Sequence, residues 1–373
     1  MSELLREVMN QRATATDRPQ LDLDAIVAAG DRRIRRKGIV TAVAATTAVV
    51  VITATAASII GSNQESRPDR VQPAGTGGDF EQRTTSYSTG SVIHYGNHEI
   101  DVAPHSLSSV VQTDDGFVFT DKGGLVYLAT ADTVNRLGQT NQPYGTLLAA
   151  GDDGPYVTWL DTDASTFKVY DTAARREVAS VEQPPQPKNP GEFDLLAVLA
   201  LDGSTAYWHT ADGVVSYDID SDQTEVVKAG ATTQWLADVA DGTLARMSSH
   251  DQSITVSRDP HSDGPTVPGF SHATLSPDAR YVATDPHDSE QVFEAATGKD
   301  VTPAAEGYSF TAVVQWTDAD DYVALGIPQG NAEDEPFDLL TCSVSSKTCT
   351  PAAKSVGVFG NVQFPIGEDL SDS

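Results

Sequence analysis

One pattern recurs along most of the chain, from Gly90 to about Gly360: an apolar strand, an acidic turn, a second strand with an aromatic residue or valine, and two more strands. Copies of this unit follow one another about every forty residues, and they begin at Val110, Leu147, Leu195, Trp235, Ser271 and Ala312. Four strands per unit at this spacing are typical of the blade of a β-propeller. A single blade cannot bury both of its faces, whereas a ring buries each blade against two neighbours. The sequence therefore predicts an all-β propeller.

The number of blades depends on a hairpin that precedes the first full unit. Residues 92–102 read VIHYGNHEIDV and turn at Gly96-Asn97. We expect this hairpin to supply the strand that closes the ring with C-terminal strands around residues 356–364, which gives a six-bladed propeller. If the hairpin instead forms part of a separate blade, the propeller is seven-bladed.

A second feature lies before the repeats: residues 38–61 contain no charged side chain. About twenty apolar residues in a helix span the roughly 30 Å hydrocarbon core of a bilayer. A cleaved signal peptide is the first alternative, but its apolar region covers only about 7–15 residues and its leading segment is shorter than residues 1–37. A buried soluble helix is the second alternative, but such a helix has a polar face. We therefore predict a single transmembrane helix.

Charged residues that flank this stretch predict its orientation. The preceding flank holds a cluster of positive residues: Arg32, Arg33, Arg35, Arg36 and Lys37. The following flank, residues 62–69, holds only one positive residue, Arg67. Because positive flanks stay on the cytoplasmic side, we predict a single-pass plasma-membrane protein with a cytoplasmic N-terminus and a large extracytoplasmic domain.

These features divide the chain into five predicted segments. They are a basic cytoplasmic tail (1–37), a transmembrane helix (38–61), a linker (62–88), an extracytoplasmic propeller (89–365) and an acidic C-terminal tail (366–373). The linker is predicted from its many Gly, Pro, Ser, Thr and Gln residues. A signalling role for residues 1–37 remains an alternative to a tail that only sets the topology.

The charge of the chain restricts its partners. It contains 24 Lys and Arg against 53 Asp and Glu, a net charge of −29, and the acidic excess lies beyond residue 61. Such a surface repels nucleic acids and anionic lipid headgroups. We therefore predict no nucleic-acid partner and a membrane contact only through the N-terminal helix.

The two cysteines of the chain, Cys342 and Cys349, lie in the segment LLTCSVSSKTCTPA, which reads as strand, turn and strand. Facing positions of such a hairpin lie within reach of a disulfide, and the extracytoplasmic side is oxidising. Two cysteines alone cannot complete a structural zinc site. We therefore predict a disulfide.

A family resemblance rests on two segments. Residues 275–283, LSPDARYVA, resemble the SPDG-(K/R)-x-(I/V)-A box of TolB-type and WD40-like propeller repeats, with Ala279 in place of the usual glycine. Residues 316–324, WTDADDYVA, resemble a degenerate copy of that box. The whole arrangement is similar to membrane-anchored propeller proteins of actinobacteria. This resemblance covers most of the chain, and it implies a fold without implying catalytic residues.

Few residues qualify as a functional site. His94 and His98, near Glu99 and Asp101, are candidate metal ligands that could meet across the turn of the hairpin, and imidazole with carboxylate suits zinc or copper. Exposed polar side chains without a ligand explain the same residues, and we predict no metal site. We predict no catalytic residue and no cofactor, because Gly-x-Ser-x-Gly and phosphate-binding loops are absent from the sequence.

The function that these features favour is a protein-binding or scaffold module that uses one face of the ring. The alternative is an extracellular enzyme that acts on a glycan or peptide from the central funnel. Convergent carboxylates or histidines with shifted pKa values in that funnel would favour the enzyme, and a funnel filled with apolar side chains would exclude it.

Overall fold

The computed structural model describes residues 80–140, 146–184, 195–248, 252–269, 272–286, 289–332 and 335–370. Every helix or strand assigned within these ranges is a β-strand. Within the same ranges, no helix is long and apolar enough to cross a membrane. The predicted cytoplasmic tail and transmembrane helix, residues 1–61, lie outside the described residues.

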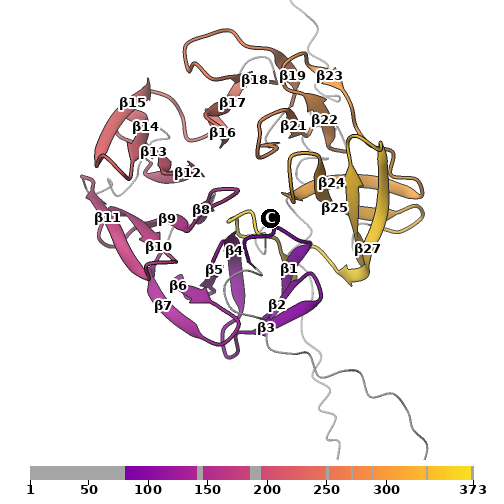
Figure 1. Cartoon of the computed structure of the whole chain (residues 1–373), viewed down its shortest axis with the longest axis horizontal. Helices are drawn as coiled ribbons and strands as arrows, with labels where there is room; N and C mark the ends of the chain where they lie inside the picture. Colours follow the sequence, from indigo (N-terminus) through magenta and orange to yellow (C-terminus); the bar gives the residue numbers. More distant parts are fainter. Residues whose placement is uncertain are drawn as a thin grey trace, which may run out of the picture. The chain divides into compact units, whose positions relative to one another are not determined.

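The strands form seven four-stranded sheets, and Figure 1 shows them as blades arranged in a ring. From the innermost strand outward, blade 1 contains β28 (Val362–Gln363), β1 (Ser86–Thr89), β2 (Val92–Tyr95) and β3 (His98–Asp101), and blade 2 contains β4 (Leu107–Thr113), β5 (Gly116–Asp121), β6 (Leu125–Ala129) and β7 (Val134–Gln139). Blade 3 contains β8 (Leu148–Ala150), β9 (Tyr156–Asp161), β10 (Thr166–Asp171) and β11 (Arg176–Glu182), and blade 4 contains β12 (Ala197–Asp202), β13 (Thr205–Thr210), β14 (Gly213–Asp218) and β15 (Gln223–Ala229).

Blade 5 contains β16 (Leu236–Ala240), β17 (Thr243–Ser248), β18 (Ser253–Ser257) and β19 (Thr266–Pro268). Blade 6 contains β20 (Ala273–Leu275), β21 (Tyr281–Thr284), β22 (Gln291–Glu294) and β23 (Lys299–Asp300). Blade 7 contains β24 (Tyr308–Trp316), β25 (Asp321–Pro328), β26 (Phe337–Ser343) and β27 (Thr348–Gly357). The prediction of an all-β propeller is confirmed, and each of the six predicted units corresponds to one of blades 2 to 7.

Blade 1 settles the blade count at seven, the second of the two counts that the sequence left open. The hairpin of residues 92–102 forms β2 and β3 of this blade. The preceding strand β1 pairs with β28 from the other end of the chain, with Ser88 opposite Gln363 and Thr89 opposite Val362. The first and the last strand of the described region thus belong to one blade, and this pairing closes the ring.

The core of the propeller lies between neighbouring blades. The Trp208 ring of blade 4 stacks on Phe167 of blade 3 at 4.6 Å and on Tyr217 at 5.0 Å between ring centroids. Its indole nitrogen donates a hydrogen bond to Thr158 Oγ1 of blade 3 at 3.1 Å. Aromatic side chains bury more apolar area than any others and therefore dominate such contacts. The aromatic residues that recur at blade spacing hold adjacent blades together.

The SPDG-like box of residues 275–283 forms the turn between β20 and β21, and its side chains stabilise that turn by hydrogen bonds. Ser276 Oγ donates to Asp278 Oδ1 at 3.0 Å, and the amide of Tyr281 donates to Ser276 Oγ at 3.0 Å. Ala279 has φ of 54°, in the left-handed region that favours glycine. The residue type that related boxes carry at this position is therefore the one that the backbone prefers.

Both ends of the folded region lie beyond the boundaries that we predicted at 89 and 365. Phe80 is 2% exposed and stacks on Tyr95 of blade 1 at 5.3 Å. Residues 366–370 pair with the inner strands of blades 2 and 3 through Gly367, whose amide donates to Val110 O at 2.9 Å. The part of the predicted C-terminal tail that the structure describes is thus packed inside the ring.

The cysteine hairpin has the predicted form. Cys342 of β26 lies opposite Cys349 of β27, and their Cα atoms are 4.0 Å apart across the disulfide.

Candidate functional site

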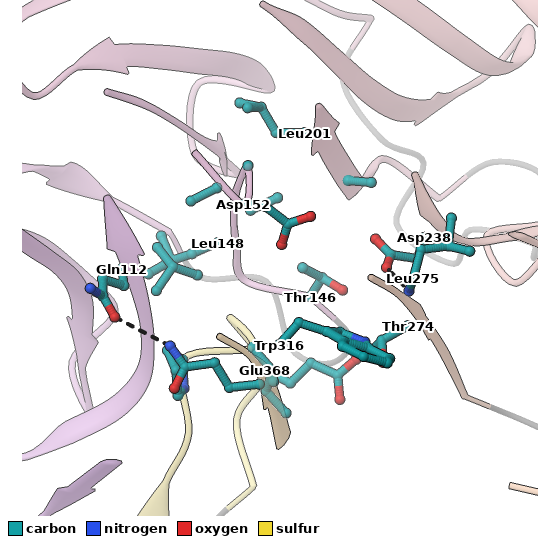
Figure 2. A pocket seen from close by; sticks show the side chains of 18 of the residues that line it. Gln112, Thr146, Leu148, Asp152, Leu201, Asp238, Thr274, Leu275, Trp316 and Glu368 are labelled. Atoms are coloured by element: carbon teal, nitrogen blue, oxygen red, sulfur yellow. Dashed lines mark hydrogen bonds between the residues drawn. The ribbon is translucent and has the colours of Figure 1, made fainter. Parts of the chain in front are cut away.

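A cavity of about 170 Å³ lies at the centre of the ring. The innermost strands of blades 2 to 7 line it, together with residues 365, 366 and 368 from the C-terminal segment. Figure 2 shows the carboxyl groups of Asp152, Asp238 and Glu368 around one space, with Leu148 and Trp316 beside them. The channel is therefore neither filled with apolar side chains nor lined with polar groups alone.

The turn that joins the innermost strand of a blade to its second strand lies on the same face of the ring in successive blades. We call these the inner turns, residues 114–115, 151–155, 203–204, 241–242, 276–280 and 317–320. Contacts between neighbours show their proximity. Gly154 N donates to Asp114 Oδ2 at 2.8 Å, and Gly242 N donates to Asp202 Oδ2 at 2.8 Å. The acidic turns of the sequence repeat thus gather on one face, which we call the inner-turn face.

Part of this acidity is structural. The carboxylate of Asp114 accepts the Gly154 amide and also contacts the Arg83 guanidinium at 3.1 Å. Arg83 donates as well to Phe80 O at 2.8 Å, and its side chain is only 9% exposed. Burial lowers the pKa of Arg83, and the charge of Asp114 opposes that shift. The positive charge of Arg83 is therefore already engaged by the protein.

Asp152 of the blade 3 inner turn differs from these residues. Among the described residues, none donates a hydrogen bond to its carboxyl group. Water in the channel reaches this side chain, yet protein surrounds it closely enough for burial to raise its pKa to about 8. Asp238, Asp202 and Asp153 raise this pKa further, and Arg83 lowers it. Asp152 therefore holds its proton more strongly than an ordinary aspartate does.

Asp238 of β16 also faces the cavity, but the backbone stabilises its negative charge. Its carboxylate accepts the Leu275 amide of blade 6 at 2.7 Å and the Val239 amide at 2.8 Å. Burial raises the pKa of Asp238 to about 6, while these two hydrogen bonds and the nearby His272 lower it. Two carboxyl groups of one cavity thus hold their protons with different strength.

His272 and Glu290 form a pair in the cavity wall. His272 Nδ1 lies 3.2 Å from Glu290 Oε1, and Glu290 also accepts the amide of Val313. Burial lowers the pKa of His272, but the hydrogen bond and charge of Glu290, with Glu368 and Asp285, outweigh it and raise the pKa to about 9. His272 is therefore a cation that Glu290 neutralises.

The structure separates the two histidines that we predicted as candidate metal ligands. His94 lies opposite Glu99 and Tyr95 lies opposite His98, so His94 and His98 point to opposite faces of the sheet. His94 Nδ1 is 3.1 Å from Glu99 Oε1, and its ring stacks on Tyr87 at 4.5 Å. The two histidines therefore do not meet across the turn, which was the arrangement that made them candidate ligands. Within the described part of the chain, no group of three or more His, Cys, Asp or Glu is arranged to hold a metal ion.

The sequence analysis missed Asp152 and Asp238 as site residues. Asp152 was visible only as one member of an acidic turn. Asp238 carried a stronger signal, because it interrupts the otherwise apolar inner strand WLADVA with a carboxylate. A charge in such a strand has to face either the channel or the core, and the channel is the less costly place.

Comparisons with known proteins add no function. No family model matches the chain, and no curated protein matches it. The solved structures that resemble it include Kluyveromyces lactis Hsv2, with 12% identity, a TM-score of 0.42 and coverage of 64% of this chain and 75% of that one. A chain of the mitotic checkpoint complex shows 12% identity, a TM-score of 0.45 and coverage of 79% and 88%, and a chain of the nidogen/laminin complex shows 10%, 0.36, 58% and 90%. Similarities at this level concern the fold, which the seven sheets establish by themselves.

Proposed function

We propose that this protein is a membrane-anchored, extracytoplasmic propeller that binds a protein partner through its inner-turn face. The observation that carries the proposal is the gathering of acidic side chains from successive blades on one face around the channel. Three arginines on this face each contact one carboxylate, but the acidic groups outnumber them. Such an acidic excess attracts a partner with a basic surface and speeds its association. The seven-bladed ring supplies a rigid support for these turns.

The anchor and the extracytoplasmic side belong to the same proposal. They rest on the uncharged stretch of residues 38–61 and on the positive cluster before it. The relationship to TolB-type propellers rests on residues 275–283. Protease treatment of intact cells tests the topology: we expect cleavage of the propeller domain from outside and protection of an epitope tag at the N-terminus.

Cross-linking on intact cells, followed by capture of the full-length chain, tests partner binding. Two matched variants reverse one exposed charge at each end of β9: Asp153→Lys in the inner turn and Asp163→Lys in the turn between β9 and β10. We expect a partner with a basic surface whose cross-link is lost in Asp153→Lys and retained in Asp163→Lys. A partner whose capture is unaffected by either variant would contradict use of the inner-turn face.

One observation favours a second candidate function, a glycan- or peptide-acting enzyme that uses the central cavity. Asp152, with its pKa raised to about 8, could donate a proton at neutral pH, while Asp238, with its pKa near 6, could accept one. A pair of carboxyl groups whose pKa values are pushed apart is the arrangement that general acid–base catalysis requires. Substrate screening with the full chain and with Asp152→Asn tests this candidate, which predicts a turnover that the variant abolishes.

A further inference from the structure

The central cavity contains a carboxyl group to which no described residue donates a hydrogen bond. The inner-turn carboxylates of Asp114, Asp241 and Asp278 each contact an arginine, namely Arg83, Arg258 and Arg280. Asp152 faces the cavity, and none of the described residues donates a hydrogen bond to it. Asp238 faces the same space from blade 5 (Figure 2). The cavity therefore offers carboxyl oxygen atoms of Asp152 as acceptors that the described residues leave unused.

A second unsatisfied acceptor lies in the wall of the same cavity. Gln315 of β24 uses its amide nitrogen to donate to Gln112 Oε1 at 3.3 Å. Its own Oε1 atom is buried and has no hydrogen-bond partner among the residues that the structure describes. A buried amide oxygen without a donor is unfavourable by about 1–3 kcal/mol, so this atom points independently to a ligand that donates hydrogen bonds.

The arrangement fits an organic cation on an apolar stem better than a metal ion. No three potential metal ligands converge within the described ranges. The side chains that line the cavity together with the carboxyl groups include Leu148 and Trp316, which suit the methylene groups of a long basic side chain. An anion would meet only Arg83 and His272 as positive groups, and Asp114 and Glu290 already neutralise them.

One end of the cavity is occupied by the protein itself. At the start of β8, the amides of Leu147 and Leu148 donate to Gly367 O of the C-terminal segment, at 2.8 and 3.2 Å. Asp152 lies past the opposite end of the same strand, in the inner turn. A ligand that reaches Asp152 therefore arrives from the inner-turn face, which is also the face that we assign to a protein partner.

We propose that the cavity binds the side chain of a lysine or arginine that a protein partner inserts from the inner-turn face, an inference that rests on the proposed protein-binding function. The cationic group lies against Asp152 and Asp238, and its N–H groups reach the free acceptor of Gln315. Burial and the charges of Asp238, Asp202 and Asp153 raise the pKa of Asp152, and Arg83 lowers it. An arriving cation favours the ionised form of Asp152, so binding releases a proton.

Calorimetry with the purified full-length chain tests this inference. The probes are the capped tripeptides Gly-Lys-Gly and Gly-Arg-Gly, with Gly-norleucine-Gly as the neutral counterpart of the lysine peptide. We expect binding of the two basic peptides, no binding of the norleucine peptide, and a heat that changes with the ionisation enthalpy of the buffer because a proton is released. Asp152→Asn should weaken binding about tenfold or more. Asp153→Asn, which removes the same charge from the next residue but outside the cavity lining, should weaken it less than about twofold.

The outcomes separate this inference from the proposed function. Equal weakening by Asp152→Asn and Asp153→Asn, or equal binding of the norleucine peptide, would overturn the cavity site, because a general surface field would then explain the result. If the basic peptides fail to bind while the cross-linked partner still depends on Asp153, the cavity inference is wrong and the protein-binding proposal stands. If the peptides bind through Asp152 but no partner depends on the inner-turn face, the cation site belongs to a free amine and the inserted side chain is refuted.

Discussion

Replacement of Gly367 by alanine should destabilise the propeller more than the same replacement at a turn glycine whose added Cβ atom would meet no other atom. Gly367 has φ of +76°, and a Cβ atom there would lie 1.8 Å from Leu148 O. A left-handed conformation costs an alanine about 1–2 kcal/mol. The contact with a backbone oxygen forces the segment away from Val110, Leu147 and Leu148, and three backbone hydrogen bonds are lost, at about 0.5–1.5 kcal/mol each. The expected loss in the free energy of unfolding is therefore about 2.5–6.5 kcal/mol.

Gly307→Ala is the matched control for this prediction. Gly307 has φ of +86°, and an added Cβ atom would meet nothing within 4 Å. This variant should lose only the conformational component, about 1–2 kcal/mol. The difference between the two variants isolates the contact of the C-terminal segment with blades 2 and 3.

Denaturant unfolding of the full-length chain, followed by tryptophan fluorescence, measures both variants. We expect the midpoint of Gly367→Ala to lie well below that of Gly307→Ala, which in turn lies slightly below the wild type. Equal midpoints for the two variants would refute the reasoning. They would mean that residues 366–370 add no stability to the ring.

Three further predictions follow from particular residues. Ala279→Gly should raise the unfolding free energy by about 0.5–1 kcal/mol, because it relieves a left-handed alanine at a small entropic cost in the unfolded chain, and an unchanged or lower denaturant midpoint would contradict this. The pKa of His272 is raised from 6.5 to about 9 on folding, so its stabilising contribution is complete below pH 6.5 and is lost as the pH rises through 9. His272→Gln should flatten the fall in melting temperature over this range, and an identical slope in the variant would count against the pairing with Glu290. Cys342→Ser should lower the unfolding free energy by about 2–3 kcal/mol, as expected for a short closed loop, and a wild-type midpoint in oxidising buffer would show that the disulfide does not constrain the unfolded chain.

The repeat in the sequence predicted the propeller because its signals are local. Alternating strands, acidic turns and aromatic residues each depend on a few neighbouring positions, and their period shows that one kind of sheet recurs. The cysteine hairpin was readable for the same reason, since Cys342 and Cys349 face each other across a single turn. The uncharged stretch of residues 38–61 is also a local signal, and it stays a prediction because it lies outside the described residues.

Closure of the ring decided what the sequence could not. Blade 1 combines β28 with β1, two short strands that lie far apart in the sequence. Neither strand has a sequence pattern that identifies the other as its partner. His94 and His98 were separated by strand register, which assigns each side chain to one face of the sheet. Asp152 and Asp238 belong to blades 3 and 5, and only the circular arrangement brings their carboxyl groups to one cavity. The sequence repeat determines the four-stranded fold of each blade. The pairing of β1 with β28 and the approach of Asp152 to Asp238 depend instead on how many blades close the ring.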